Sequence, residues 1–189
     1  MAEVYAFLAD GSEEVECLAV ADVLVRAGIK VTLVSISNNK EVTGSHGFTI
    51  VADTTIGEID FEQADLLFLP GGMPGTKRLS ECRPLCDALV KANEEGRRLA
   101  AICAAPSVLG GLGILKGKTA TCYPGFEGAL AGANVTGDGV VTDGNVTTAR
   151  GLGYALDLGL ELTRLLLGEK TASHILSLIH ISEPTRLAL

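Results

Sequence analysis

Cys103 stands where a chain can expose a reactive thiol. The apolar stretch Leu99–Ile102 has the length of a strand and ends on Cys103, and Ala104, Ala105 and Pro106 follow at once. A strand, a sharp turn and a helix in this order form a nucleophile elbow, which holds the reactive atom at the carboxyl end of a buried strand. Because the amino end of the next helix favours negative charge, we expect the thiol to lose its proton more easily than a free cysteine. From position alone, a small buried apolar residue is an equally good interpretation.

A carboxyl group could tune this thiol, and Glu16 is the best candidate. It follows the predicted strand Val4–Ala9 and the turn after it. A carboxyl group turned inward is costly unless it is protonated or hydrogen-bonded. For Glu13, Glu14 and Glu16 together, the sequence therefore favours a solvated acidic first turn of a helix.

Two adjacent glycines, Gly71 and Gly72, follow the apolar stretch Asp65–Pro70. After a strand, such a pair can expose neighbouring backbone N–H groups as an oxyanion hole. A plain tight turn is an equally good interpretation.

Few residues in the sequence are placed for histidine-dependent catalysis or for metal binding. His46 lies in a polar hairpin, and His174 and His180 lie near the end of the chain, so a Cys-His dyad of the protease kind is poorly supported. Cys82 and Cys86 are spaced as one helix face rather than as two ligands, and we expect no metal site. We find no phosphate-binding or dinucleotide-binding glycine motif, and we expect no cofactor.

The predicted elements alternate between buried strands and helices, which indicates an α/β domain with a doubly wound, mostly parallel sheet in three layers. Ligands in such sheets bind at the carboxyl ends of the strands, where Asp10, Gly71, Gly72 and Cys103 fall. The first helix is expected to be capped by Ser12, to stop at Gly28 and to bury Val15 and Leu18. The other predicted elements are strands Val31–Ile36 and Thr119–Cys122, a hairpin over Lys40–Val51, helices Pro84–Glu95 and Tyr154–Leu167, and a meander over Gly132–Ala149.

Composition narrows the class of protein. The chain has 189 residues, 47% of them hydrophobic, a formal net charge of −8 and five cysteines. No apolar run is long enough for a membrane span, no basic leader starts the chain, and no basic cluster suggests nucleic acid or an anionic membrane as a partner. We therefore expect a cytoplasmic protein whose cysteines are thiols rather than disulfides.

The end of the chain does not continue this pattern. Residues 176–189 show no helical or strand period that extends the fold. They resemble the translation of a sequencing-library adapter read in frame. We therefore expect one domain over residues 1–175 and a non-native tail over residues 176–189.

Four motifs taken together resemble the ThiJ/PfpI family, on its DJ-1-like branch. They are Asp10–Glu16, Leu69–Gly72, Ala100–Pro106 and Thr148–Gly151, and the match runs in order over nearly the whole chain. The resemblance implies a flavodoxin-like three-layer sandwich and a homodimer.

The resemblance also implies roles for individual residues. Cys103 would be the nucleophile and the oxidation-sensitive residue, and Glu16 would be protonated and hydrogen-bonded to its sulfur. Gly71, Gly72 and Ala104 would provide the backbone donors to an oxyanion, and Tyr123 and Arg150 would line the pocket.

Two departures bear on activity. Ala104 stands where protease-like members of the family have a histidine, which counts against a peptidase, and Tyr123 stands where several DJ-1-like members have a histidine. The resemblance implies a cofactor-free glyoxalase or protein deglycase acting on 2-oxoaldehydes such as methylglyoxal. The alternative is a non-catalytic redox sensor or stress chaperone that uses oxidation of the same cysteine. A class I amidotransferase-like hydrolase is a weaker option, because its triad needs a histidine.

Overall fold

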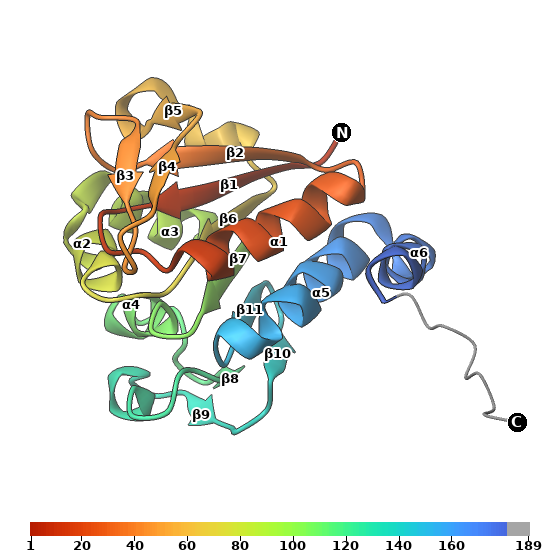
Figure 1. Cartoon of the computed structure of the whole chain (residues 1–189). Coiled ribbons are helices and arrows are strands. Elements are labelled where there is room, and N and C mark those ends of the chain that lie inside the picture. The colour runs from red at the N-terminus through yellow and green to blue at the C-terminus, as the bar shows by residue number, and fades with distance from the viewer. Residues whose placement is uncertain (181–189) are drawn as a thin grey trace, which may run out of the picture.

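A seven-stranded sheet forms the middle layer of the protein (Figure 1). The computed structural model describes residues 1–180. The strand order is β10-β11-β7-β6-β1-β2-β5, and only the β10–β11 pair is antiparallel. The strands are β1 (Glu3–Leu8), β2 (Lys30–Ser35), β5 (Thr54–Thr55), β6 (Leu66–Leu69), β7 (Arg98–Ile102), β10 (Val140–Asp143) and β11 (Val146–Ala149).

Helices cover both faces of this sheet. Two separate apolar cores form, one under α1 and α5 and the other under α2, α3 and α4, while α6 packs on α5 (Figure 1). The predicted doubly wound, flavodoxin-like three-layer fold is therefore confirmed. The helices are α1 (Glu14–Arg26), α2 (Gly75–Glu81), α3 (Arg83–Glu94), α4 (Pro106–Gly111), α5 (Ala155–Leu167) and α6 (Glu169–Ile179). The 3₁₀ turns are η1 (Ile56–Glu58), η2 (Phe61–Gln63), η3 (Glu127–Ala129) and η4 (Leu152–Tyr154).

The central strands are apolar on both sides because both faces are covered. In β1, Tyr5 and Phe7 enter the core under α3, while Val4 and Ala6 enter the core under α1. All four side chains are buried, which is typical of a strand inside a parallel sheet. The continuous apolar runs of the sequence therefore identified the strands on which the candidate site depends.

Two small sheets lie outside the main one. The predicted hairpin over Lys40–Val51 is confirmed as β3 (Glu41–Thr43) paired with β4 (Thr49–Val51). The predicted meander is wrong in part, since β9 (Asn134–Val135) pairs in parallel with β8 (Thr119–Ala120) and only β10 and β11 form a hairpin.

The start of α1 differs from the prediction. Glu13, not Ser12, caps the helix, because the Glu13 carboxylate accepts the backbone N–H of Glu16 at 2.6 Å. The Ser12 hydroxyl accepts the backbone N–H of Ala9 instead. Val15 and Leu18 are exposed, so the predicted buried face was wrong at these two positions. The helix is turned so that Glu14, Glu16 and Cys17 face inward.

The end of the described chain also differs. Residues 176–179 continue helix α6, so the expectation that no helical pattern extends past residue 175 was wrong for them. Ile175 and Ala172 anchor this helix, while Leu176 and Leu178 are largely exposed. The remainder of the predicted tail, residues 181–189, lies outside the described residues.

Over residues 1–180, no helix combines the length and apolar character that a membrane crossing requires.

Helix α1, which carries Glu16, is held in position by close packing against α5. A Cβ added at Gly159 of α5 would lie 2.7 Å from Cβ of Val23. We expect Gly159→Ala to lower the free energy of unfolding by about 1–3 kcal/mol through overpacking, despite the better helix propensity of alanine. Urea unfolding measures this change. Gly111→Ala is the matched control, because the added methyl group meets nothing within 4 Å there; equal stabilities of the two variants would contradict the prediction.

Candidate active site

Cys103 follows β7 directly and makes the sharp turn that leads into α4. Its backbone φ is 64°, and it is the one non-glycine residue with positive φ within residues 1–180. The turn is held on both sides, since Cys103 N–H donates to Ala149 at 2.9 Å and Tyr123 N–H donates to the Cys103 carbonyl at 2.8 Å. The residue is half-buried, so its sulfur is neither sealed in the core nor fully in water. This is the elbow geometry that the sequence predicted.

Glu16 reaches this elbow from α1. The residue is 1% exposed, so the predicted solvated position is wrong. Its carboxyl Oε2 accepts the backbone N–H of Gly71 at 3.0 Å, and the Cys103 thiol and the backbone N–H of Leu152 lie close enough to this carboxyl group to lower its pKa. These partners offset the cost of burying an acid. The sequence alone could not identify them.

Gly71 allows the acid and the thiol to meet. A Cβ at Gly71 would lie 2.6 Å from both the Glu16 Oε2 atom and the Cys103 Cβ atom. Any side chain there would therefore separate them. Gly72 has φ 87°, and a Cβ at Gly72 would overlap the backbone nitrogen of Glu13. The two glycines let the loop after β6 lie directly against the start of α1.

Two backbone donors face the sulfur of Cys103. The N–H groups of Gly72 and Ala104 lie beside it, and each lowers the pKa of the thiol. They come from different loops, one after β6 and one after β7, which are neighbouring parallel strands. The arrangement thus offers two N–H groups where negative charge on sulfur, or on an oxygen bound beside it, would be stabilised.

Glu16 and Cys103 oppose each other's ionisation. Burial is the main cause that raises the pKa of Glu16 to about 7, and the charge of Glu13 adds to it. Burial, the charge of ionised Glu16 and the contact of its carboxyl group with the thiol raise the pKa of Cys103 to about 12. The expectation of an acidic thiol is therefore wrong while Glu16 is ionised. The thiolate can form near neutral pH only if Glu16 keeps its proton, so the pair carries one negative charge, not two.

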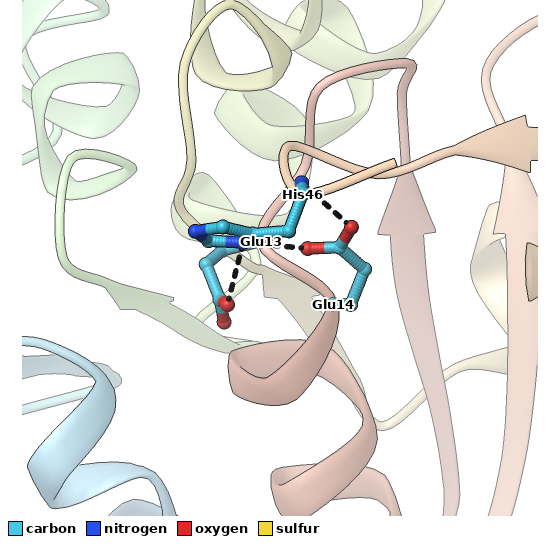
Figure 2. A group of neighbouring side chains, drawn as sticks. All are labelled: Glu13, Glu14 and His46. Atoms are coloured by element: carbon cyan, nitrogen blue, oxygen red, sulfur yellow. Dashed lines mark hydrogen bonds and ion pairs between the residues drawn. The ribbon is translucent and has the colours of Figure 1, made fainter. Parts of the chain in front are cut away.

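A second polar cluster lies beside this pair, and the sequence did not predict it. Figure 2 shows Glu13, Glu14 and His46, with the imidazole of His46 placed between the two carboxylates. The His46 Nδ1 atom is 3.2 Å from Glu14 Oε2 and 3.5 Å from Glu13 Oε1. His46 is remote from the acids in sequence, and only the return of the β3–β4 hairpin over α1 brings it there.

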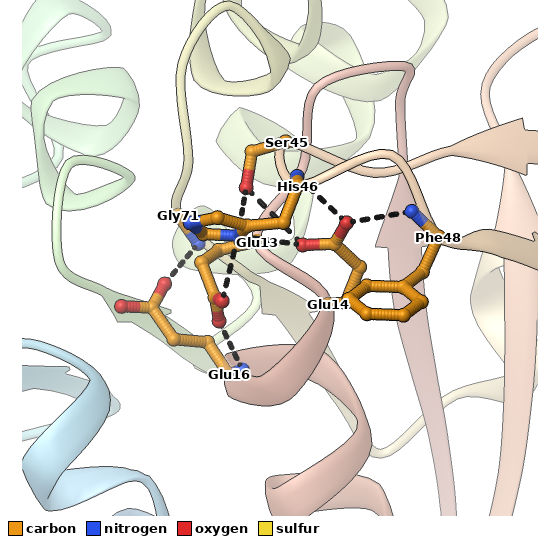
Figure 3. A network of polar contacts seen from close by, with 7 residues as sticks. All are labelled: Glu13, Glu14, Glu16, Ser45, His46, Phe48 and Gly71. Carbon is orange, nitrogen blue, oxygen red and sulfur yellow. Dashed lines mark hydrogen bonds and ion pairs between the residues drawn. The ribbon is translucent and has the colours of Figure 1, made fainter.

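Glu14 fastens this hairpin to α1. Its Oε1 accepts the backbone N–H groups of His46 at 2.8 Å and Phe48 at 3.3 Å, and Ser45 Oγ donates to its Oε2 (Figure 3). Burial alone would raise its pKa, but these hydrogen bonds and its own backbone N–H outweigh burial and lower the pKa to about 2. Gly44 is required at the hairpin tip, since a Cβ there would overlap the Glu14 carboxyl group.

The acidic start of α1 thus joins the hairpin to the elbow. Figure 3 shows Glu13 between His46 and the backbone N–H of Glu16, and Glu16 reaching Gly71. A signal was available for Glu13 and Glu14, because the positive helix end attracts acids. No comparable signal in the sequence could have identified His46.

The two predicted pocket residues have different positions. Tyr123 is half exposed, and its backbone joins it to Cys103. The Arg150 guanidinium donates to the carbonyl of Gly137 at 2.9 Å, in the loop between β9 and β10, and no described contact brings it to Cys103. Tyr123 stays a predicted pocket residue, while the observed bond of Arg150 is to that loop.

Comparison with known proteins places this arrangement in context. The family model described as DJ-1/PfpI family matches residues 2–165. The chain belongs to the DJ-1/PfpI family. It is 40% identical over 170 residues to protein DJ-1 homolog B of Arabidopsis thaliana, a match that covers 89% of this chain and 39% of that protein. The chain therefore spans less than half the length of that relative.

Shorter members of the DJ-1/PfpI family match over most of their length. The chain is 33% identical to the glutathione-independent glyoxalase DJR-1.2 of Caenorhabditis elegans, over 87% of this chain and 88% of that one. It is 34% identical to a deglycase of Pyrococcus abyssi, over 75% of this chain and 86% of that one. The solved structure of oxidized Toxoplasma gondii DJ-1 superposes with a TM-score of 0.91 at 30% identity, over 95% of this chain and 98% of that one.

The raised pKa of Glu16 predicts a pH-dependent stability. Its pKa is 4.5 in a model carboxyl group and about 7 here, so between these values the folded protein holds a proton that the unfolded chain has lost. Stability should therefore fall as pH rises through this window, by about 3 kcal/mol in total.

Glu16→Gln removes this contribution and leaves the other acids unchanged. The difference in the free energy of unfolding between Glu16→Gln and wild type should grow in favour of the variant from about pH 4.5 to pH 7. Urea unfolding at a series of pH values measures it. Parallel stability profiles for the two proteins would show that Glu16 has an ordinary pKa.

Proposed function

We propose that this protein is a cofactor-free enzyme of the glyoxalase or deglycase type that converts 2-oxoaldehydes such as methylglyoxal to 2-hydroxy acids. The observation that carries the proposal is the juxtaposition of Glu16 and Cys103, whose side chains both lie against Gly71 and shift each other's pKa. The named activities of the worm glyoxalase and the archaeal deglycase support the same class of substrate. Reactive carbonyl groups on small molecules, or on glycated proteins, are the partners that this chemistry requires.

The reaction would begin at sulfur. The Cys103 thiolate adds to the aldehyde carbon, the carbonyl electron pair moves to oxygen, and Glu16 gives that oxygen its proton. The N–H groups of Gly72 and Ala104 stabilise negative charge that develops at this point. The product of this step is a hemithioacetal.

The Glu16 carboxylate left by the first step would then act as a base. As a carboxylate it removes the hydrogen from the former aldehyde carbon, the electron pair of the ketone carbonyl moves to oxygen, and protonation of that oxygen gives an enediol. The hydroxyl group on the former aldehyde carbon then loses its proton as a proton is delivered to the neighbouring carbon. The result is a thioester of a 2-hydroxy acid, in which the aldehyde carbon is oxidised and the ketone carbon is reduced within one molecule. Water cleaves the thioester and restores the thiol. The net change is addition of one water, so no external redox partner is needed.

The resting state should have its negative charge on sulfur. Burial favours the neutral form of Glu16, and two N–H groups face the sulfur. A protonated Glu16 would donate a hydrogen bond to the thiolate and lower the pKa of Cys103, whereas an ionised Glu16 raises it.

Substitution of Glu16 distinguishes a resting charge on the Cys103 sulfur from one on the Glu16 carboxyl group. If the charge rests on sulfur, Glu16→Leu removes a donor and should slow alkylation of Cys103 by about tenfold or more at pH 7. Glu16→Gln keeps an N–H donor, so it should reduce the rate of Cys103 alkylation less than Glu16→Leu does. Peptide mass spectrometry after a timed iodoacetamide pulse measures the rate at Cys103 alone. Faster alkylation in Glu16→Leu than in wild type would place the charge on Glu16.

Activity depends on both side chains. Cys103→Ser and Glu16→Gln should each lower lactate formation from methylglyoxal by about 100-fold or more, because each removes a group that bonds to or moves a proton on the substrate. Cys82→Ser is the matched control, since Cys82 lies at the α2–α3 junction. Equal lactate production by Cys103→Ser and wild type would rule out the proposed function.

The alternative, a redox sensor or stress chaperone, uses the same sulfur. The similarity of the chain to the solved structure of oxidized Toxoplasma gondii DJ-1 supports this alternative. The N–H groups of Gly72 and Ala104 could equally stabilise the oxygens of a sulfinic acid at Cys103. Wild-type protein that forms no lactate but gains two oxygen atoms at Cys103 after mild peroxide would support this alternative. The position of His46 argues against a peptidase, because this histidine contacts Glu13 and Glu14 rather than Cys103.

A further inference from the structure

We propose that Glu13, Glu14 and His46 form a binding site for a divalent transition-metal ion, best suited to Zn²⁺. The site lies where the tip of the β3–β4 hairpin covers the start of α1 (Figure 2). It stands independently of the proposed function, because none of its three ligands is asked to act on a substrate.

The geometry is that of a partial coordination shell. One oxygen from each carboxylate and the Nδ1 atom of His46 all lie within 4.8 Å of one another. The two nitrogen-to-oxygen distances are 3.2 and 3.5 Å. Ligand atoms around a tetrahedral zinc ion with bonds of about 2.0–2.1 Å are separated by about 3.4 Å, so little movement would be needed to admit one.

The carboxylates are already oriented by other bonds. Glu13 Oε2 caps α1, and Glu14 Oε1 accepts two N–H groups of the hairpin. The other oxygens, Glu13 Oε1 and Glu14 Oε2, both face the Nδ1 atom of His46, and Ser45 Oγ contacts both Glu14 Oε2 and this nitrogen. Within residues 1–180, Glu13 Oε1 accepts no direct hydrogen bond from a protein group and lies 3.5 Å from His46 Nδ1. A single nitrogen carries at most one proton and can donate to only one of the two oxygens, whereas a metal ion would bind both.

The charge balance points the same way. In the described part of the chain, His46 is the one basic side chain within ion-pair distance of Glu13 or Glu14. A neutral imidazole therefore leaves two buried carboxylates without a cationic partner, apart from the partial charge of the helix end. A divalent cation would neutralise both.

The donor set selects the kind of cation. Mg²⁺ and Ca²⁺ prefer shells made of oxygen alone, whereas an imidazole with carboxylates suits zinc and its transition-metal neighbours. The His46 side chain is 65% exposed, so the ion can enter from solvent and water can complete the shell. Three protein ligands with an open fourth position are typical of accessible zinc sites.

Zinc titration of the full chain tests the site. Reduced, metal-free protein is titrated with zinc chloride against a chromophoric chelator. Wild type should bind one ion at this site, and His46→Gln should weaken that binding by at least about tenfold. His174→Gln is the matched control, because His174 is an exposed histidine on α6. Cys103→Ser should bind zinc as wild type does, which separates this site from binding by the reactive thiol.

Glu13→Gln provides a second variant that keeps an oxygen to cap α1. It should also bind zinc more weakly, with an unchanged circular dichroism spectrum. Three outcomes would overturn the proposal: no one-to-one binding by wild type, equal binding by His46→Gln and wild type, or loss of binding in Cys103→Ser alone. If Glu13→Gln fails to fold, the comparison of His46→Gln with His174→Gln decides, since the His46 side chain is 65% exposed.

Discussion

The site depends on one constraint, that a buried acid and a half-buried thiol share a single negative charge. Neither Glu16 nor Cys103 can ionise freely, since burial raises the pKa of both and each charge opposes the other. The hydrogen bond from Gly71 to the acid and the N–H groups of Gly72 and Ala104 beside the sulfur make the shared charge tolerable. Structure and reactivity are thus coupled, because moving a proton within the pair converts an inert thiol into a nucleophile beside an acid.

Three glutamates within four residues of one helix start have three different tasks. Glu13 caps α1, Glu14 holds the β3–β4 hairpin, and Glu16 reaches the thiol. Their pKa values differ accordingly, about 2 for Glu14 with its many donors and about 7 for Glu16 in its poorer environment. The amino acid type is the same at all three positions, and only the number of N–H partners and the degree of burial distinguish them.

The sequence predicted the sheet and the elbow because both depend on local patterns. Apolar strands, a glycine pair and a Cys-Ala-Ala-Pro turn are visible without tertiary information. The inward position of Glu16 was missed, because its burial depends on donors from Gly71 and Leu152, which are distant in the chain. The same holds for His46, whose neighbours are set by the return of a hairpin. The resemblance to a known family predicted that Glu16 lies beside the sulfur, but it did not predict the position of His46.

The left-handed backbone of Cys103 has a consequence for laboratory evolution. A residue with a Cβ atom at φ 64° is strained, and glycine would relieve that strain. Selection for heat resistance alone would therefore tend to replace Cys103 with glycine and yield a more stable protein without the thiol. Retention of cysteine at this position under such a selection would itself reveal that the thiol is needed.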